Sequence, residues 1–171
     1  ITTADGNDLL QLGDGADVGG SFAAGAGDDE LSFAGYLTAR DVAITAVNAT
    51  DGFNGTEVAI VGGFTSVNSL VGSANGSDAL QGLAATAAVW TIDSVGSYNA
   101  GGEVMAISSF EDLTGSSDDD RFRFGSFGVG TVPQVTVSAG TGDDQLVANV
   151  NGSDFLVTAE NEGTVLVRNA A

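Results

Sequence analysis

Short alternations of apolar and polar residues, separated by turns rich in glycine and aspartate, run along the chain. The clearest alternation is Arg121-Phe122-Arg123-Phe124, which places both phenylalanines on one face of a strand and both arginines on the other. Glycine tolerates the backbone of tight turns, and aspartate closes such turns with its side chain. The best helical candidate, residues 84–88, is too short to be stable by itself. The pattern therefore predicts an all-β chain.

One turn-and-strand unit recurs, in which small and polar residues precede an aspartate and alternating apolar positions follow it. Copies of this unit begin at Ala4, Gly25, Ala74, Ser116, Gly140 and Asn151, with a weaker copy at Gly13. Ile1-Thr2-Thr3-Ala4 also lines up with Leu113-Thr114-Gly115-Ser116, so the second half of the chain echoes the first. We therefore expect the chain to begin and end inside a repeat, as a segment of a head-to-tail array does.

The repeats lead to a specific fold prediction. Units of about 20 residues cannot each bury their own apolar face, and such units gain stability by stacking on one another. We predict a parallel β-solenoid of the β-helix or β-roll kind with Gly/Asp turns, and a β-sandwich is the alternative. Residues 1–171 are expected to form a single domain, with Asp/Gly-turn coils in 1–40, a longer strand module in 41–115 and a second set of coils in 116–171.

Charge and composition exclude several functions. The chain carries 23 acidic residues and four arginines, has no lysine, histidine or cysteine, and has a formal net charge of −19. Nucleic acid is excluded as a partner because phosphate contacts need a basic face. Zinc sites built from Cys or His, and catalysis by His, Lys or Cys, are impossible. No apolar run is long enough for direct membrane insertion. We expect no enzyme, because the paired acids of a glycosidase would lack basic neighbours.

Two motifs resemble a known family. The units from Gly25 to Phe33 and from Gly140 to Ala148 resemble the RTX (haemolysin-type) calcium-binding nonapeptide, Gly-Gly-x-Gly-x-Asp-x-apolar-x. The segment from Phe110 to Gly115 resembles a Val-Glu-Asn-Leu-Thr-Gly-Gly segment of large secreted bacterial surface proteins. Only Asp8 and Asp17 follow each other at the nonapeptide step of nine, so the resemblance implies isolated calcium sites and no continuous ladder of ions.

The resemblance implies Ca²⁺ as the bound ion and an extracellular or cell-surface location. Calcium takes six to eight oxygen ligands, which carboxylates and turn carbonyls supply. The alternative is that these aspartates only close turns, which is our interpretation of Asp78 and Asp154. The candidate metal ligands are Asp8, Asp17, Asp28, Asp29, Asp118, Asp119, Asp120, Asp143 and Asp144.

These observations predict a structural or surface-assembly segment, stiffened by calcium. It would form part of an extracellular filament, surface layer or long adhesin by docking end to end or laterally on copies of itself. The alternative is a carbohydrate-binding adhesin domain, in which Trp90, Tyr36 or Tyr98 would stack on sugar rings and the loop over residues 47–55 would contribute. The strand context of Trp90 favours core packing instead.

Overall fold

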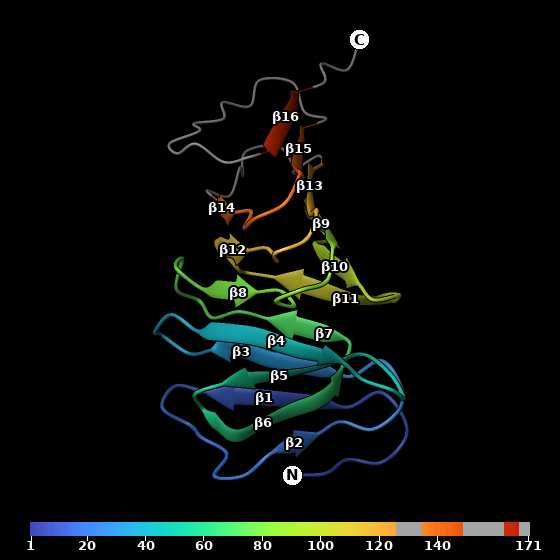
Figure 1. Ribbon diagram of the computed structural model, residues 1–171. Coiled ribbons are helices and arrows are strands. Elements are labelled where there is room, and N and C mark those ends of the chain that lie inside the picture. Colours follow the sequence, from blue (N-terminus) through green and yellow to red (C-terminus); the bar gives the residue numbers. More distant parts are fainter. Residues whose placement is uncertain (126–134, 149–162, 168–171) are drawn as a thin grey trace.

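The computed structural model describes residues 1–125, 135–148 and 163–167, and strands dominate these ranges (Figure 1). The described part contains no helix of the length and hydropathy that a membrane crossing needs. Its strands form two sheets. The nine-stranded sheet has the order β1 (Leu9–Gly13), β3 (Glu30–Gly35), β7 (Ser69–Val71), β11 (Glu103–Ser108), β10 (Ser97–Ala100), β9 (Ala88–Ile92), β13 (Arg121–Phe124), β15 (Asp144–Ala148) and β16 (Gly163–Val167). The seven-stranded sheet has the order β14 (Thr136–Ser138), β12 (Asp112–Thr114), β8 (Ala79–Gln81), β4 (Asp41–Val47), β5 (Phe53–Glu57), β6 (Ile60–Val67) and β2 (Phe22–Ala23).

The prediction of an all-β chain is confirmed, but the prediction of a parallel β-solenoid is wrong. Both sheets are mixed. In the seven-stranded sheet β5 runs antiparallel to β4 and to β6, and in the nine-stranded sheet β10 runs antiparallel to β9 and to β11. The fold is therefore a sandwich-like arrangement of two mixed sheets, closer to the alternative that the sequence left open. Both antiparallel meanders lie within residues 41–115.

A tight turn explains why β10 and β11 run antiparallel. Ala100 of β10 pairs with Glu103 of β11, so only Gly101 and Gly102 connect the two strands. Both glycines have positive φ, at 60° and 93°, which is the backbone of a two-residue hairpin turn. Such a turn reverses the chain. Apolar alternation marks a strand but carries no information about its direction, so the sequence pattern was compatible with either arrangement.

The second meander is held together by a glycine under an aromatic ring. Glu57 of β5 pairs with Ile60 of β6 across another two-residue connection. Within β5, a Cβ added at Gly55 would lie 2.3 Å from Cζ of Phe64. The Phe64 ring therefore packs directly over the backbone of β5, and only glycine leaves room for it.

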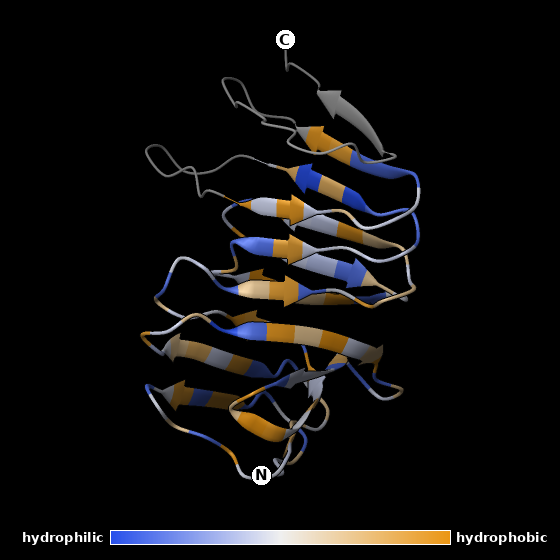
Figure 2. Ribbon diagram, turned by 60° about the vertical axis from the view of Figure 1, so that its left-hand side comes forward, coloured by the Kyte–Doolittle hydropathy of each residue, from blue (hydrophilic) through white to orange (hydrophobic). Residues whose placement is uncertain are grey.

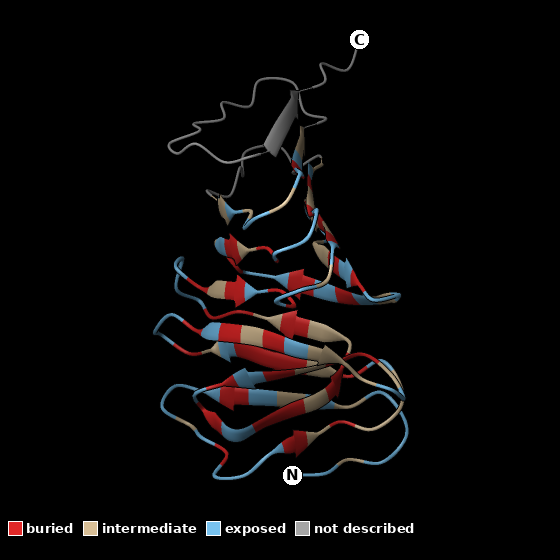
Figure 3. Cartoon of the chain, in the orientation of Figure 1, coloured by how far each residue is buried: buried red, intermediate tan, exposed pale blue. Residues whose placement is uncertain are grey.

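The core lies between the sheets and is rich in aromatic side chains. Phe53 of the seven-stranded sheet packs against Tyr98 of the nine-stranded sheet, with ring centroids 5.4 Å apart. Trp90 lies 4.4 Å from Tyr98 and stacks on Phe122 at 5.6 Å, measured between ring centroids. Apolar residues alternate with polar ones along the strands (Figure 2), and the buried residues follow the same alternation (Figure 3).

The two ends of the stack are formed by different parts of the chain. β1 and β2 lie at the end that carries the N-terminus, and β15 and β16 lie at the opposite end (Figure 1). Residues before β1 extend the seven-stranded sheet beyond β2, because Thr2 forms a parallel bridge with Ala23. The outermost layer at this end is therefore made by residues 1–13, which contribute to both sheets.

Candidate functional site

The most distinctive polar feature is a contact between two stacked aspartate turns. We call residues 4–8 and 25–29 the N-terminal turn pair. The backbone N–H of Asp8 donates to Oδ1 of Asp29 at 2.8 Å, and the N–H of Glu30 donates to the carbonyl oxygen of Asp8 at 2.9 Å. One carboxylate thus holds the start of the neighbouring strand in place. The contact links the turn before β3 to the turn before β1.

The same contact recurs at the other end of the molecule. We call residues 116–120 and 140–144 the C-terminal turn pair. The N–H of Asp120 donates to Oδ1 of Asp144 at 2.8 Å, and the N–H of Gln145 donates to the carbonyl oxygen of Asp120 at 2.8 Å. The turns that repeat in sequence between the two halves of the chain therefore also repeat the same hydrogen bonds.

The preceding residue in each turn repeats the pattern at the surface. Oδ1 of Asn7 accepts the N–H of Asp28 at 3.0 Å, and Oδ1 of Asp119 accepts the N–H of Asp143 at 2.8 Å. In each pair, one side chain of each turn therefore accepts a backbone N–H from the other turn. This arrangement fixes how far the two turns are shifted along each other.

Glycine makes this close stacking possible. Gly27 and Gly140 have φ of 132° and 103°, a backbone that residues with a Cβ rarely adopt. A Cβ added at Gly27 would lie 2.5 Å from the carbonyl oxygen of Gly6, and one at Gly140 would lie 1.8 Å from the carbonyl oxygen of Ser116. The glycines of the motif thus serve the contact between turns as well as the turn itself.

Two further aspartates use both carboxylate oxygens to hold backbone. Oδ1 of Asp78 accepts the N–H of Arg40 at 2.5 Å, and its Oδ2 accepts the N–H of Ser73 at 2.7 Å. Asp120 is bound in the same way, with Oδ1 accepting the N–H of Ala88 at 2.7 Å and Oδ2 accepting the N–H of Ser116. Both carboxylates are buried, so their role in this structure is to satisfy backbone donors.

The structure brings most of the predicted metal ligands together in the two turn pairs. Asp17 is the exception, because it lies beyond the opposite end of β1 from Asp8 and is exposed. Asp154 lies outside the described residues. The predicted ligands within the turn pairs are Asp8, Asp28 and Asp29 in the first, and Asp118, Asp119, Asp120, Asp143 and Asp144 in the second.

Asp29 differs from Asp78 and Asp120 because one of its oxygens is buried without a partner. The residue is fully buried, Oδ1 accepts the N–H of Asp8, and Oδ2 has no hydrogen bond among the described residues. Burial raises the pKa of Asp29, and the nearby charges of Asp8, Asp51 and Asp28 raise it further. A negative charge on this carboxylate is therefore poorly compensated in the structure.

Sequence reasoning missed Asp51. It lies between β4 and β5, where it accepts the N–H of Gly27 at 3.1 Å through Oδ2 and the side-chain amide of Asn68 at 3.0 Å through Oδ1. Asp51 belongs to no repeat unit, so no sequence signal connects it with Asp29. Only the packing of the long β4–β5 connection against the N-terminal turn pair brings the two acids close.

The donor set can be tested for its fit to calcium, the ion that the family resemblance implies. The oxygens of Asp120 already accept backbone N–H groups, so this residue does not fit a calcium ligand. Asp29 fits better, because Oδ2 is unpartnered and Asp8, Asp28 and Asp51 lie near. Across the described ranges, however, no three acidic side chains converge closely enough to hold a metal ion. The N-terminal turn pair is thus the better calcium candidate, and it lacks a complete ligand set.

Arg40, one of only four basic residues, lies inside the protein. Its guanidinium donates to Glu57 in an ion pair and lies 4.2 Å from the ring centroid of Tyr36. Glu57 also accepts the N–H of Ala59 at 2.7 Å, and both members of the pair are buried. Sequence reasoning missed this pair. A single arginine at the edge of a strand gave no sign of which of 23 acidic residues it would contact.

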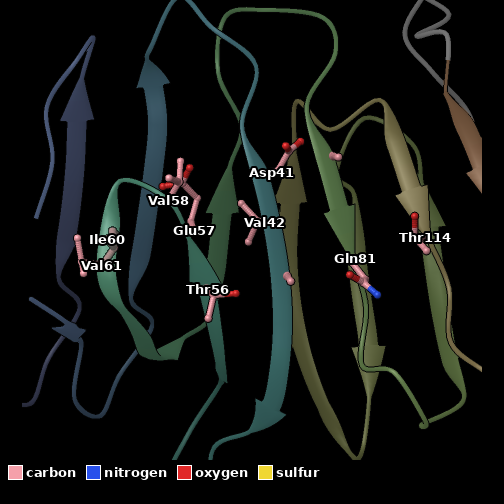
Figure 4. A pocket seen from close by; sticks show the side chains of 11 residues that line it. Asp41, Val42, Thr56, Glu57, Val58, Ile60, Val61, Gln81 and Thr114 are labelled. Atoms are coloured by element: carbon pink, nitrogen blue, oxygen red, sulfur yellow. The ribbon is translucent and has the colours of Figure 1, made fainter.

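A shallow groove of about 630 Å³ crosses the seven-stranded sheet near this pair (Figure 4). Val58 and Val61 stand exposed on its rim, at 80% and 74% of their full surface. The carboxylate of Glu57 is engaged by Arg40, which leaves Asp41 as the other acid of the lining. The groove therefore holds no acid–base pair. It is lined by Asp41, Val42, Ala43, Thr56, Glu57, Val58, Ile60, Val61, Ala79, Gln81 and Thr114.

The aromatic residues considered for sugar stacking are all in the core. Trp90 and Tyr98 are fully buried, and Tyr36 is 4% exposed. Burial raises the pKa of Tyr98 to about 12, and its hydroxyl accepts the N–H of Leu83 at 2.8 Å. The expectation that Trp90 packs in the core is confirmed. These three rings offer no surface on which a sugar could stack.

Comparison of the chain with models of protein families, with curated proteins and with solved structures gave no match. The resemblance to RTX repeats therefore rests on the short motifs alone.

Proposed function

We propose that this chain is a structural segment of an extracellular assembly, in which copies dock on one another to extend a filament, a surface layer or a long adhesin. The observation that carries the proposal is the recurrence of one turn-to-turn contact at both ends of the molecule, through Asp8 and Asp29 and again through Asp120 and Asp144. A contact that a chain makes twice within itself is suited to being made again between chains.

The edges of the sheets support docking. In the described part, the nine-stranded sheet ends at β1 and β16, and the seven-stranded sheet ends at β14 and at the residues around Thr2, which pair with β2. Edge strands carry backbone donors and acceptors that pair readily with another chain. Exposed apolar side chains also lie near the N-terminal end, where Ile1 is 57% and Leu9 is 61% exposed.

Calcium has a supporting place in the proposal. A divalent cation beside Asp29 would neutralise a buried carboxylate that has no partner on Oδ2 and is surrounded by other acids. Asp29 and Asp8 are the residues that would hold it. The remaining ligands would come from turn carbonyls and water, as calcium accepts. Binding to the folded state alone would stiffen the N-terminal turn pair and raise stability.

Two measurements on the intact chain test the proposal. Sedimentation velocity over a range of protein concentrations should show growing oligomers, and a protein that stays monomeric throughout would contradict the docking function. Thermal melting followed by the fluorescence of Trp90, the only tryptophan, should show a higher midpoint with calcium than with chelator. The Asp29→Asn variant should lose most of this shift, and Asp41→Asn, at an exposed acid away from the turn pairs, should keep it.

A further inference from the structure

Inside the described stack, a buried aspartate carboxylate repeatedly accepts a backbone N–H from the start of the neighbouring strand. In each case the donor comes earlier in the chain than the aspartate and lies at or just before the start of the strand next to it. The carboxylate therefore fixes the register between the two strands. The four examples are Asp8 N–H to Asp29 at 2.8 Å, Arg40 N–H to Asp78 at 2.5 Å, Ala88 N–H to Asp120 at 2.7 Å and Asp120 N–H to Asp144 at 2.8 Å.

Asp8 occupies the same position in its turn as Asp120 does. Each donates its own N–H to the next aspartate at 2.8 Å, and each accepts an N–H from the following strand through its carbonyl oxygen. The two residues differ in what their own carboxylates accept. The carboxylate of Asp120 receives the N–H of Ala88, whereas the carboxylate of Asp8 receives no hydrogen bond from the described residues, because β1 is the edge of its sheet.

We propose that the Asp8 carboxylate is the acceptor that sets the register of an incoming strand, and that this strand is β16 of a second copy of the chain. The inference rests on the proposed docking function and identifies the residue that determines the geometry of docking. It requires β16 of one copy to lie parallel to β1 of the next. Strand directions within the molecule meet this requirement.

Both sheets begin and end with strands that run in the same direction. In the nine-stranded sheet every neighbouring pair is parallel except those that involve β10, and two antiparallel steps restore the original direction. In the seven-stranded sheet only the pairs that involve β5 are antiparallel, so its first and last strands also run in the same direction. A second copy stacked head to tail therefore continues the nine-stranded sheet, with its β1 parallel to β16 of the first copy. Such a head-to-tail contact is heterologous, and it extends into a filament when the rotation between copies does not close a ring.

The register of the new pair follows from the registers inside the molecule. Val89 pairs with Arg121, and Arg121 pairs with Gln145, so Ala88, Asp120 and Asp144 lie at one level. Asp144 pairs with Gly163, which places the N–H of Gly163 at the level of the donors in the stack. Docked on β1, Gly163 would donate to the Asp8 carboxylate, and position 164 would lie opposite Leu9.

Sedimentation of point variants in calcium-free buffer tests the role of Asp8. Replacing Asp8 with Ala should weaken association about tenfold or more, because it removes a charged acceptor from a hydrogen bond. Asp8→Asn keeps an amide oxygen that can accept the N–H, and should associate nearly as wild type does. Asp5→Ala removes an exposed charge from the same turn and serves as the control for charge alone. Since no described residue hydrogen-bonds to the Asp8 carboxylate, each variant should melt close to wild type.

Cross-linking tests the register independently. The chain has no cysteine, so a Leu9→Cys, Thr164→Cys double variant introduces only the designed pair. Mild oxidation should convert it into a ladder of covalent oligomers, whereas Leu9→Cys with Val165→Cys, which is shifted by one residue, should cross-link poorly. Wild-type protein that never associates would overturn both the docking function and this inference. Association that is unchanged by Asp8→Ala, or that cross-links best in the shifted pair, would overturn the inference alone.

Discussion

Arg40 and Glu57 form a buried ion pair, and the Arg40 guanidinium also packs 4.2 Å from the ring centroid of Tyr36. Arg40 is 7% exposed and Glu57 is 4% exposed, so water screens the pair poorly. Removing one partner leaves the other as an isolated buried charge. The pair therefore makes a sharp prediction about stability.

Arg40→Met should lower the free energy of unfolding by about 3–5 kcal/mol, because Glu57 would keep its charge without a partner. The double variant Arg40→Met, Glu57→Gln should recover much of the loss, since it removes both charges and keeps an oxygen for the N–H of Ala59. Urea unfolding followed by Trp90 fluorescence measures both. A double variant as unstable as the single one would show that the contact of the guanidinium with the Tyr36 ring dominates.

Asp78→Ala should destabilise the fold by about 3 kcal/mol, because the buried N–H groups of Arg40 and Ser73 would lose their acceptor. Asp41→Ala, which removes an exposed acid one residue after Arg40, should change stability by less than about 0.5 kcal/mol. Chemical denaturation of the two variants side by side measures the difference. Equal effects would mean that the Asp78 carboxylate does not hold the backbone.

Gly72→Ala should be strongly destabilising, because a Cβ at this position would lie 1.8 Å from the carbonyl oxygen of Ser109. Overpacking of this kind costs about 3 kcal/mol when the obstacle is backbone that cannot move aside. Gly76→Ala is the matched control, since no atom lies within 4 Å of its Cβ position and its φ is not positive. Thermal melting should separate the two, and a Gly72→Ala protein with wild-type stability would refute this packing.

Stability without calcium should rise as the pH falls from 7 toward 3.8, the ordinary pKa of an aspartate. Burial raises the pKa of both Asp29 and Asp144, so the folded protein binds protons more tightly than the unfolded chain does. A raised folded-state pKa adds stability that is complete at low pH and is lost as the pH rises through that pKa. Melting midpoints across this range measure the effect.

The Asp29→Asn, Asp144→Asn double variant should flatten this pH dependence while keeping the Oδ1 acceptors. Lower net charge at acid pH reduces repulsion in every variant, so the difference from wild type isolates the two buried groups. An Asp41→Asn variant provides the comparison for loss of an exposed acid. A double variant with the wild-type slope would assign the pH dependence to overall charge.

The sequence by itself determined the strands and the turns. The Arg121–Phe124 alternation became β13, with Phe122 buried and Arg123 exposed, because a period of two has one structural meaning in a half-buried strand. The sequence also aligned Asp8 with Asp120, and both residues donate their N–H to the aspartate of the following turn. It contained no sign of the Arg40–Glu57 pair or of Asp51 beside Asp29, which join residues from separate parts of the chain.

Only the tertiary structure decided the direction of the strands and the state of each carboxylate. The Gly101-Gly102 turn reverses the chain between β10 and β11 of the nine-stranded sheet, although the apolar pattern on either side is the same for both directions. Asp29 and Asp120 sit in similar motifs, yet one has an unpartnered oxygen and the other is fully hydrogen-bonded. The physical reason is that residue type sets which bonds a side chain can form, while the neighbouring strand in the stack sets which of them it does form.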